Sequence, residues 1–273
     1  NCIFTSDLHG RQGRLDSLFQ VVEEEKPEAV FVGGDILPRR SSAERYLSMN
    51  FFPEILKLKR DTRFFVIMGN DDPRVYEGYF LDADREGIID YVHGDVRQFK
   101  HLNVVGYTMV PPTPFRLKDW ELYDVSRNLD PGDISPEEGV RTVDVDPRSI
   151  KFDTISSQLK ALSNLSDPKR TIYIFHSPPY DTPLDRAGLD GVKVDHAPLD
   201  LHVGSIAIRR FIERYQPPLT LHGHIHESRS ITGQWRIRLG NTWCFNGSND
   251  GSGIALIRFD TEDISSAELE IMD

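Results

Sequence analysis

Short apolar segments recur along the chain, and most of them end in Gly, Asp, Asn or His. Their length and their content of β-branched and aromatic side chains are typical of buried strands. The polar residue or glycine that follows each run marks the point where the strand ends. We therefore expect strands at 2–7, 29–35, 64–70, 103–107, 171–176 and 219–224.

Helical spacing of apolar residues occurs between these runs. One stripe consists of Leu15, Leu18, Phe19 and Val22, and a second consists of Ile206, Phe211, Ile212 and Tyr215. The second stripe follows Ser205, a candidate N-cap. The stretch 43–60 also has helical spacing, with a break or kink expected near Pro53. Strands that alternate with helices predict an α/β sheet covered by helices.

The C-terminal part of the chain has a different pattern. Apolar runs at 242–247 and 253–259, and the alternating Ala267, Leu269 and Ile271, follow one another with short turns and no helical spacing. This pattern favours antiparallel strands. We expect these strands to form a second sheet.

The stretch at about 111–152 lacks periodicity and is rich in Pro, Asp and Gly. An irregular segment of this length inside a compact domain is uncommon, and it is often functional when it occurs. A solvated surface excursion is the alternative, and the sequence leaves both open. We interpret residues 1–273 as a single domain with this long irregular insertion.

Composition narrows the class of protein. The charged fraction is 27%, the hydrophobic fraction is 38%, and no apolar run approaches the roughly 20 residues of a membrane helix. The formal net charge of -11 argues against a general nucleic-acid binder, which usually has a basic face. The chain has only two cysteines, which are too few for a disulfide framework. We therefore expect a protein of the reducing cytoplasm. The sequence begins without Met and enters a strand at once, so we expect further residues before Asn1, and a removed targeting segment stays open.

Polar side chains capable of binding metal follow five of the expected strands. In α/β sheets, ligands collect beyond the carboxyl ends of the strands, so we expect one shared site at one edge of one sheet. In an extended chain alternate side chains lie on one face, so both histidines of GHIH, His224 and His226, can point into it. The candidates are Asp7, His9, Asp35, Asn70, His176, His224 and His226.

Each of these residues alone is more often a structural group than a ligand, and a Gly-Asp pair is most often a turn. The prediction of a metal site therefore depends on the occurrence of all seven residues together, in this order along the chain. Oxygen and nitrogen donors without a thiolate suit Mn, Fe, Zn or Co better than a structural zinc site.

The motifs D-x-H, G-D, G-N, H and G-H-x-H, in this order from residue 7 to residue 226, resemble the calcineurin-like metallophosphoesterase superfamily. HSPPY, VGSIAIRRFIE and GHIHES look closest to its small prokaryotic phosphoesterases. The resemblance implies a four-layer α/β/β/α sandwich with two mixed β-sheets and a site for two divalent transition metal ions. It assigns Asp7, His9 and His226 to the first ion, Asn70, His176 and His224 to the second, and makes Asp35 a bridging and catalytic residue.

The resemblance also implies a reaction. Two divalent ions outweigh Asp7, Asp35 and a bridging hydroxide by about one positive charge, so the site would attract an anionic phosphoryl group. Metal ions lower the pKa of bound water, and a metal-bound hydroxide would attack the phosphorus in line. The expected partner is a small phosphomonoester or phosphodiester.

This sequence departs from the family at one catalytic position. Family members carry G-N-H, whereas this chain reads Gly69-Asn70-Asp71. A carboxylate is a poor acid near two metal ions, which puts in doubt the protonation of alkyl leaving groups. Asp71 therefore stands as a doubtful catalytic candidate, and His196 or His202 could supply the proton or serve as ordinary surface histidines.

Further residues are candidates for substrate contacts. Arg11 could bind phosphate or form a surface salt bridge, and Tyr180 with Asp181 could line the cleft. Arg116 and Trp120 of the irregular segment could reach over the metals, because loops on a rigid scaffold carry specificity.

Two other functions remain open. A non-catalytic scaffold of the same fold fits the loss of the family histidine, but such a protein could have shed its metal ligands, and all seven candidates are present. A nuclease of the same superfamily is disfavoured by the acidic composition.

Overall fold

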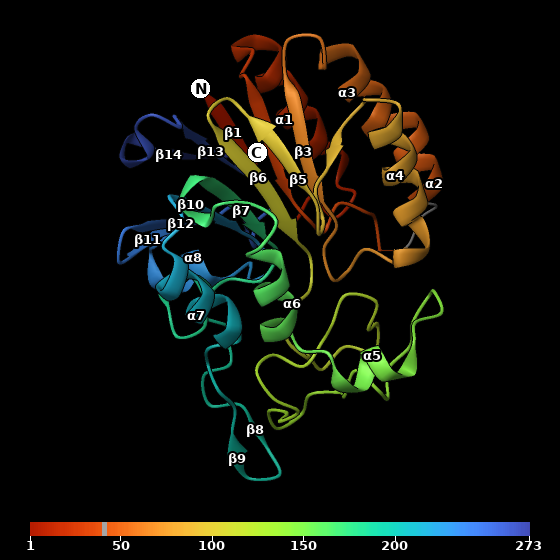
Figure 1. Ribbon diagram of the computed structural model, residues 1–273, viewed down its shortest axis with the longest axis vertical. Helices are drawn as coiled ribbons and strands as arrows, with labels where there is room; N and C mark the ends of the chain where they lie inside the picture. The colour runs from red at the N-terminus through yellow and green to blue at the C-terminus, as the bar shows by residue number, and fades with distance from the viewer. Residues whose placement is uncertain (40–42) are drawn as a thin grey trace.

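Two six-stranded mixed sheets form the centre of the molecule, and the structure, a computed structural model, describes residues 1–39 and 43–273 (Figure 1). The first sheet has the order β14-β13-β1-β2-β3-β4. Strands β1 to β4 are parallel, and β13 is antiparallel to both of its neighbours, β1 and β14. Its strands are β1 (Cys2–Thr5), β2 (Ala29–Gly33), β3 (Arg63–Ile67), β4 (Asp90–Tyr91), β13 (Ile254–Phe259) and β14 (Glu268–Met272).

The second sheet has the order β11-β12-β10-β7-β6-β5, with parallel strands in the middle and an antiparallel strand at each edge. Its strands are β5 (Val96–Phe99), β6 (Leu102–Tyr107), β7 (Thr171–Phe175), β10 (Leu219–His222), β11 (Arg236–Leu239) and β12 (Thr242–Asn246). A small separate hairpin consists of β8 (Lys193–Val194) and β9 (Ala197–Pro198).

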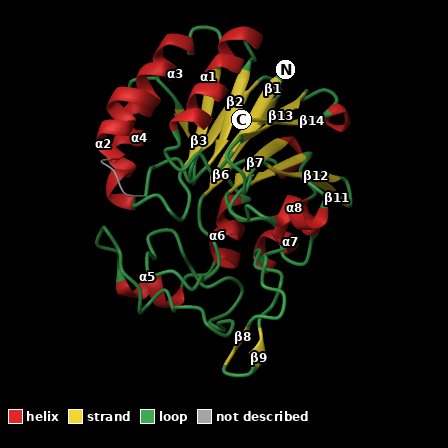
Figure 2. Cartoon of the chain, turned by 180° about the vertical axis from the view of Figure 1, so that it is seen from behind, coloured by secondary structure: helices red, strands yellow, loops and turns green. Residues whose placement is uncertain are grey.

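Helices cover the outer faces of both sheets (Figure 2). On the first sheet lie α1 (Gln12–Glu25), α2 (Ala43–Tyr46), α3 (Phe52–Leu58) and α4 (Glu77–Arg85), and on the second lie α6 (Ile155–Leu162) and α7 (Ile206–Tyr215). Two short helices are α5 (Pro147–Phe152) and α8 (Ser228–Thr232). No helix in the described part of the chain is both long and apolar enough to cross a membrane.

The continuous apolar runs arise because both faces of the central strands are buried. In β1, Phe4 belongs to the core between the two sheets, and Ile3 belongs to the core under the helices. In β7, Ile174 faces the inner core and Tyr173 the outer one. The four layers expected from the resemblance are therefore confirmed.

The structure confirms the predicted N-cap at Ser205 and the predicted break in the helical stretch 43–60. Ser205 caps α7, since its hydroxyl accepts a hydrogen bond from the amide of Ile208 at 3.0 Å. The stretch 43–60 is split by a π-helical turn at Leu47–Phe51, and Pro53 lies in the first turn of α3, where it needs no amide hydrogen.

The prediction that the C-terminal strands form a second sheet is wrong in part. β12 joins the second sheet beside β10, to which it runs parallel, whereas β13 and β14 return to the first sheet, where Ile257 lies opposite Phe4 of β1. Each sheet thus contains strands from both halves of the chain. The single domain over 1–273 stays a prediction, and this interleaving supports it.

The irregular stretch at about 111–152 is ordered by isolated bridges and by buried side chains. Its backbone pairs Val110 with Glu121 and Leu117 with Val140. Trp120 is fully buried, so the stretch is more than a solvated excursion. A helix, α5, occupies its end, and Asp146 caps it; because α5 buries none of its side chains, it leaves no apolar periodicity to detect.

Candidate metal centre

The candidate ligands lie where the carboxyl ends of strands from both sheets meet. Asp7, Asp35 and Asn70 follow β1, β2 and β3 of the first sheet, and His176 and His224 follow β7 and β10 of the second. The expectation that one sheet carries the whole site is therefore wrong. Sequence periodicity does not reveal which sheet a strand joins, because pairing is decided by contacts far apart in the chain.

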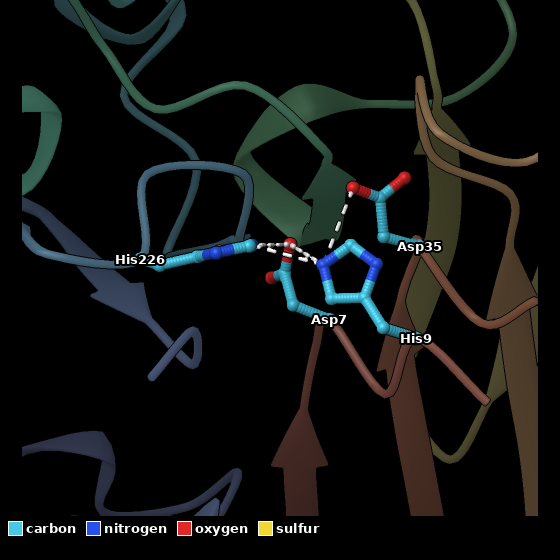
Figure 3. A group of neighbouring side chains, drawn as sticks. All are labelled: Asp7, His9, Asp35 and His226. Atoms are coloured by element: carbon cyan, nitrogen blue, oxygen red, sulfur yellow. Dashed lines mark hydrogen bonds and ion pairs between the residues drawn. The ribbon is translucent and has the colours of Figure 1, made fainter. Parts of the chain in front are cut away.

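The first ligand group consists of Asp7, His9, Asp35 and His226 (Figure 3). The Nε2 atoms of His9 and His226 lie 3.1 Å apart, and His226 Nε2 lies 3.0 Å from Oδ1 of Asp7. Two imidazole nitrogens at about 2.1 Å from one shared ion would be separated by about 3.0 Å at a right angle and by about 3.4 Å at a tetrahedral angle. The spacing of the two rings therefore fits a common ion.

The second group consists of Asp35, His176 and His224, and Asn70 lies beside it. His176 is fully buried, with Nε2 3.0 Å from Oδ1 of Asn70 and 3.4 Å from Oδ2 of Asp35. Its Nδ1 contacts the carbonyl oxygen of Gly33 at 2.7 Å. An imidazole that donates from one nitrogen to a carbonyl presents the other as an acceptor for a metal.

Asp35 joins the two groups through one oxygen atom. Its Oδ2 lies 3.9 Å from Nε2 of His9 and 3.4 Å from Nε2 of His176. Its Oδ1 accepts a hydrogen bond from the backbone amide of Asp71 at 2.8 Å, which fixes the carboxylate rotamer. This geometry is what a shared ligand between two adjacent ions requires.

The backbone is strained at the ligands. Asp7, His9, Asp35 and His224 have φ of 60°, 49°, 51° and 70°, in the left-handed region that residues with a side chain rarely adopt. Such conformations cost of order 1–3 kcal/mol each and gather at functional sites. Four strained candidate ligands at one site point to a functional constraint on their placement.

Two glycines allow the strand ends to approach one another. A Cβ at Gly223 would lie 2.0 Å from Oγ of Ser6 and 2.6 Å from Oδ2 of Asp7, and a Cβ at Gly69 would lie 2.2 Å from Oδ1 of Asp35. A side chain at either position would push a candidate ligand away. Gly223 is therefore required by close packing between the two sheets, and Gly69 by close packing between neighbouring strand ends of the first sheet.

The two histidines of the GHIH motif do not extend from a strand. β10 ends at His222, and the chain turns through His224 and His226, so the alternation expected for an extended chain is absent. The turn directs His226 into the first ligand group and His224 into the second. The positive φ of His224, rather than the strand pleat, separates them.

Arg14 supports the first group and has no counterpart in the sequence prediction. It is 3% exposed, and its guanidinium donates to the carbonyl oxygens of Asp7 at 2.5 Å, Asn249 at 3.0 Å and Gly251 at 2.6 Å. Arg14 thereby ties the turn that carries Asp7 and His9 to the loop before β13. Its sequence position, beside the apolar stripe of α1, gives no signal of this role.

Asp72 supports the loops of Asp35 and Asn70. It is fully buried and accepts hydrogen bonds from the amides of Gly69 at 2.9 Å, Ile36 at 3.0 Å and Leu37 at 2.7 Å. Burial and the nearby Asp35 carboxylate raise the pKa of Asp72 to about 7. The sequence motif points to Asp71 at this turn and gives no signal for Asp72.

Electrostatics couples the candidate ligands. Burial lowers the pKa of His176, but the Asp35 and Asp7 carboxylates outweigh it and raise that pKa to about 9. Burial and the positive charge of His176 lower the pKa of His224 to about 3. Burial raises the pKa of Asp7, yet His226 outweighs it and lowers that pKa below its usual range. The protein thus surrounds two buried carboxylates with positive charge, which a cation could also supply.

Asp71 lies at the edge of the site and is paired with Arg39. Nε of Arg39 donates to Oδ2 of Asp71 at 2.9 Å, and Nη2 donates to the same oxygen. The same oxygen lies 3.9 Å from Nδ1 of His9. The sequence analysis did not single out Arg39.

Three of the predicted substrate contacts do not line the cleft above the candidate ligands. Arg11 is exposed and donates to the carbonyl oxygen of Gly251 at 2.9 Å. Arg116 is exposed and does not line the cleft described below. Trp120 is buried, with its indole nitrogen donating to the carbonyl oxygen of Asp72 at 2.8 Å, so it cannot reach over the site.

Two other predicted residues line the cleft. Tyr180 donates its hydroxyl to Asp200 at 2.6 Å, and Nδ1 of His202 lies 2.7 Å from Oδ1 of Asp185. Asp181 is exposed and pairs with Arg209, and His196 is exposed in the β8–β9 hairpin. His202 is therefore the histidine of this region that borders the cleft.

A cleft of about 610 Å³ opens above the two ligand groups. Its floor includes Asp35, Asn70, His224 and His226, and its walls come from the irregular stretch after β6 and from the segment between β7 and α7. This places the candidate ligands within reach of a small molecule.

The sequence matches the calcineurin-like phosphoesterase family over residues 1–228, and the chain belongs to that family. It is similar in fold to the protein TT1561 of Thermus thermophilus, at 18% identity and a TM-score of 0.60, covering 100% of this chain and 97% of that one. It is also similar to a dimetal phosphatase from Danio rerio, at 13% identity and a TM-score of 0.53, covering 94% and 91%. Comparison with curated protein sequences finds no match.

Proposed function

We propose that the protein is a phosphoesterase that uses two divalent transition metal ions to hydrolyse a phosphomonoester or a phosphodiester. The observation that carries the proposal is the position of Asp35 Oδ2, which faces ligand groups on both sides. The family membership and the fold of the dimetal phosphatase support the same reaction.

The residues of both groups fit the ions that the proposal requires. Asp7, His9 and His226 would hold one ion, Asn70, His176 and His224 the other, and Asp35 both. Nδ1 of His9 is buried and has no hydrogen-bond partner among the described residues, and its Nε2 faces Nε2 of His226, another candidate ligand, at 3.1 Å. Two ions bound here would activate a water molecule and offset the charge on the phosphoryl oxygens. Oxygen and nitrogen donors favour Mn, Fe, Zn or Co.

The protein's own residues hold this arrangement before any substrate arrives. Arg14 fixes the turn of Asp7, Asp72 fixes the turns of Asp35 and Asn70, and the amide of Asp71 sets the rotamer of Asp35. Preorganised groups lose little free energy to rearrangement during the reaction.

The pairing of Asp71 with Arg39 bears on the leaving group. Burial and the Asp35 carboxylate raise the pKa of Asp71, whereas Arg39 lowers it, and two cations beside this carboxylate would keep it ionised. Asp71 would then be a poor proton donor, and the alcohol would leave largely unprotonated. We therefore expect aryl esters, whose leaving groups are weak bases, to react faster than alkyl esters. The acid in the reaction of an alkyl ester would have to come from water or from another group at the cleft.

Metal content and hydrolysis test the proposal. Protein loaded with Mn²⁺ should contain two ions per chain by elemental analysis and should hydrolyse bis(p-nitrophenyl) phosphate. Asp35→Asn and His226→Gln should lower kcat/KM at least 100-fold, whereas His101→Gln, an exposed histidine in the β5–β6 turn, should match the parent. Equal activity in the parent and Asp35→Asn would rule the proposal out.

A non-catalytic scaffold of the same fold remains the second candidate, because Asp71 replaces the family histidine. Its hallmark would be the absence of hydrolysis across a panel of aryl and alkyl esters even with both metal positions filled. A nuclease is less favoured, since the cleft carries more carboxylates than cationic side chains among its described lining residues. We also infer a cytoplasmic location, since Cys2 and Cys244 are buried free thiols.

A further inference from the structure

The cleft is far larger than a phosphate group, and its outer walls combine apolar side chains with carboxylates. Its volume of about 610 Å³ lies within the range of about 300–1,000 Å³ typical of sites for small organic molecules. Away from the floor, its lining includes Phe115, Leu189, Val194, Leu199 and Val203. A phosphoryl group at the metal ligands would leave most of this volume to the rest of the ester.

The two walls of the cleft, the irregular stretch after β6 and the segment between β7 and α7, lie against each other. Figures 1 and 2 place the irregular stretch and the β8–β9 hairpin on the same side of the two sheets. A Cβ at Gly132 of the first wall would lie 3.2 Å from Val194 of the hairpin. The first wall is held internally, since Ile134 donates its amide to the carbonyl oxygen of Thr113 at 3.0 Å.

The charge in the cleft opposes a second anionic group. Arg39 is the only lysine or arginine among the described lining residues, and Asp71 already occupies it. Asp130, Asp133 and Asp200 line the cleft outside the two ligand groups. Burial, and then the charge of Asp130, raise the pKa of Asp133 to about 6.

We propose that the ester bound at this site has a bulky apolar alcohol group that carries no negative charge of its own. The inference rests on the proposed phosphoesterase function and specifies its substrate class. The metals would bind the phosphoryl group, and the apolar side chains of the walls would pack against the ring or hydrocarbon of the alcohol. The wall carboxylates would weaken the binding of nucleoside polyphosphates and bisphosphorylated sugars by like-charge repulsion.

A series of phosphonates tests the inference by binding alone. Methylphosphonate, benzylphosphonate and 4-carboxybenzylphosphonate share the metal-binding group, and in the last two a methylene separates that group from the ring. Calorimetry with Mn²⁺-loaded protein should show benzylphosphonate binding about tenfold more tightly than methylphosphonate, because the ring leaves water. The carboxylated compound should lose most of this gain.

Two variants and a control connect the binding to the walls. Leu199→Ala should reduce the advantage of benzylphosphonate severalfold without changing methylphosphonate binding. Asp133→Asn should strengthen binding of the carboxylated compound severalfold. Val192→Ala, a control on the same segment whose side chain is exposed and does not line the cleft, should change neither value.

The outcomes separate the two proposals. Methylphosphonate binding without any gain from the benzyl ring, or equal binding of the benzyl and carboxybenzyl compounds, would overturn the substrate class and leave the phosphoesterase proposal intact. If methylphosphonate fails to bind the metal-loaded protein and no ester is hydrolysed, both proposals fall. Ring-dependent binding that Leu199→Ala weakens and Val192→Ala preserves supports the inference.

Discussion

Arg39 places two nitrogen atoms on a single oxygen of Asp71, the residue that follows the candidate ligand Asn70. The resemblance to the family leads one to expect a histidine at position 71, and this chain has an ion pair there instead. Under the proposed function, the site would keep its candidate metal ligands, and its chemistry toward the leaving group would differ.

The first prediction restores the family residue. Asp71→His should raise kcat/KM for an alkyl phosphate at least tenfold relative to an aryl phosphate, because a positioned imidazole supplies general-acid catalysis worth about 10²–10⁴-fold. Asp71→Asn, which removes the charge without adding an acid, is the matched control. The readout is the ratio of the two kcat/KM values, and an unchanged ratio in Asp71→His would show that proton donation does not limit the alkyl reaction.

The second prediction concerns Arg14. Arg14→Met should lower the free energy of unfolding by about 2 kcal/mol, since it leaves the buried carbonyl oxygens of Asp7 and Asn249 without their donor. It should also weaken Mn²⁺ binding about 10–100-fold, as loss of groups that orient ligands does in other metal sites. Denaturant titration and metal competition measure the two effects. Arg11→Met, an exposed neighbour with one carbonyl contact, should stay close to the parent in both.

The third prediction concerns the buried ion pair of the irregular stretch. Lys118 and Glu121 are both fully buried and in contact, and Lys118 also donates to the carbonyl oxygen of Thr113 at 2.7 Å. Lys118→Met should cost about 3–5 kcal/mol of stability, because it strands a buried carboxylate. Adding Glu121→Gln should recover at least about 1 kcal/mol of this loss. Strict additivity in a double-mutant cycle would show that the two side chains do not interact.

The fourth prediction concerns pH and His93, which lies outside the candidate metal centre. Burial, and then the charge of Arg74, lower the pKa of His93 to about 4, and its Nδ1 accepts the amide of Thr108 at 3.1 Å. The unfolded chain, with an ordinary histidine pKa near 6.5, binds the proton first as the pH falls. Stability from His93 is therefore complete above about pH 6.5 and is lost between about pH 6.5 and 4.

Between pH 7 and pH 5 this group should account for about 1–2 kcal/mol of lost stability, allowing for its partial exposure. His93→Gln keeps an acceptor for Thr108 and removes the titration, so its denaturation midpoint should fall less between these pH values than that of the parent. His101→Gln serves as the exposed control. A midpoint that falls equally in all three proteins would exclude His93 as a source of acid sensitivity.

The candidate ligands could be predicted from the sequence because they follow predicted strands. The end of such a strand is recognisable as an apolar run followed by a polar residue. Asp7, Asp35 and His176 could be found in this way. The helix α6 was also within reach, since Ile155, Leu159 and Leu162 have helical spacing behind a cap at Thr154, although the sequence analysis did not identify it.

Other parts of the site had no local signature. The hydrogen bonds of these supporting residues form only when folding brings their partners close. Arg14 donates to a backbone carbonyl, Arg39 donates to a carboxylate, and Asp72 accepts from backbone amides. A single charged residue leaves no periodic pattern, so nothing in the sequence distinguished Arg14 from Arg11. The assignment of strands to two sheets depended equally on long-range pairing, which is why β13 and β14 were placed wrongly.

The ligand groups draw on both sheets, and His9 and His226 meet across 217 positions of the chain. An ion shared by these side chains can be captured only after the first and the last thirds of the polypeptide have come together. If the proposed metal centre forms, metal uptake would be a late event of folding, and a nascent chain still lacking its C-terminal part would have no complete centre to fill.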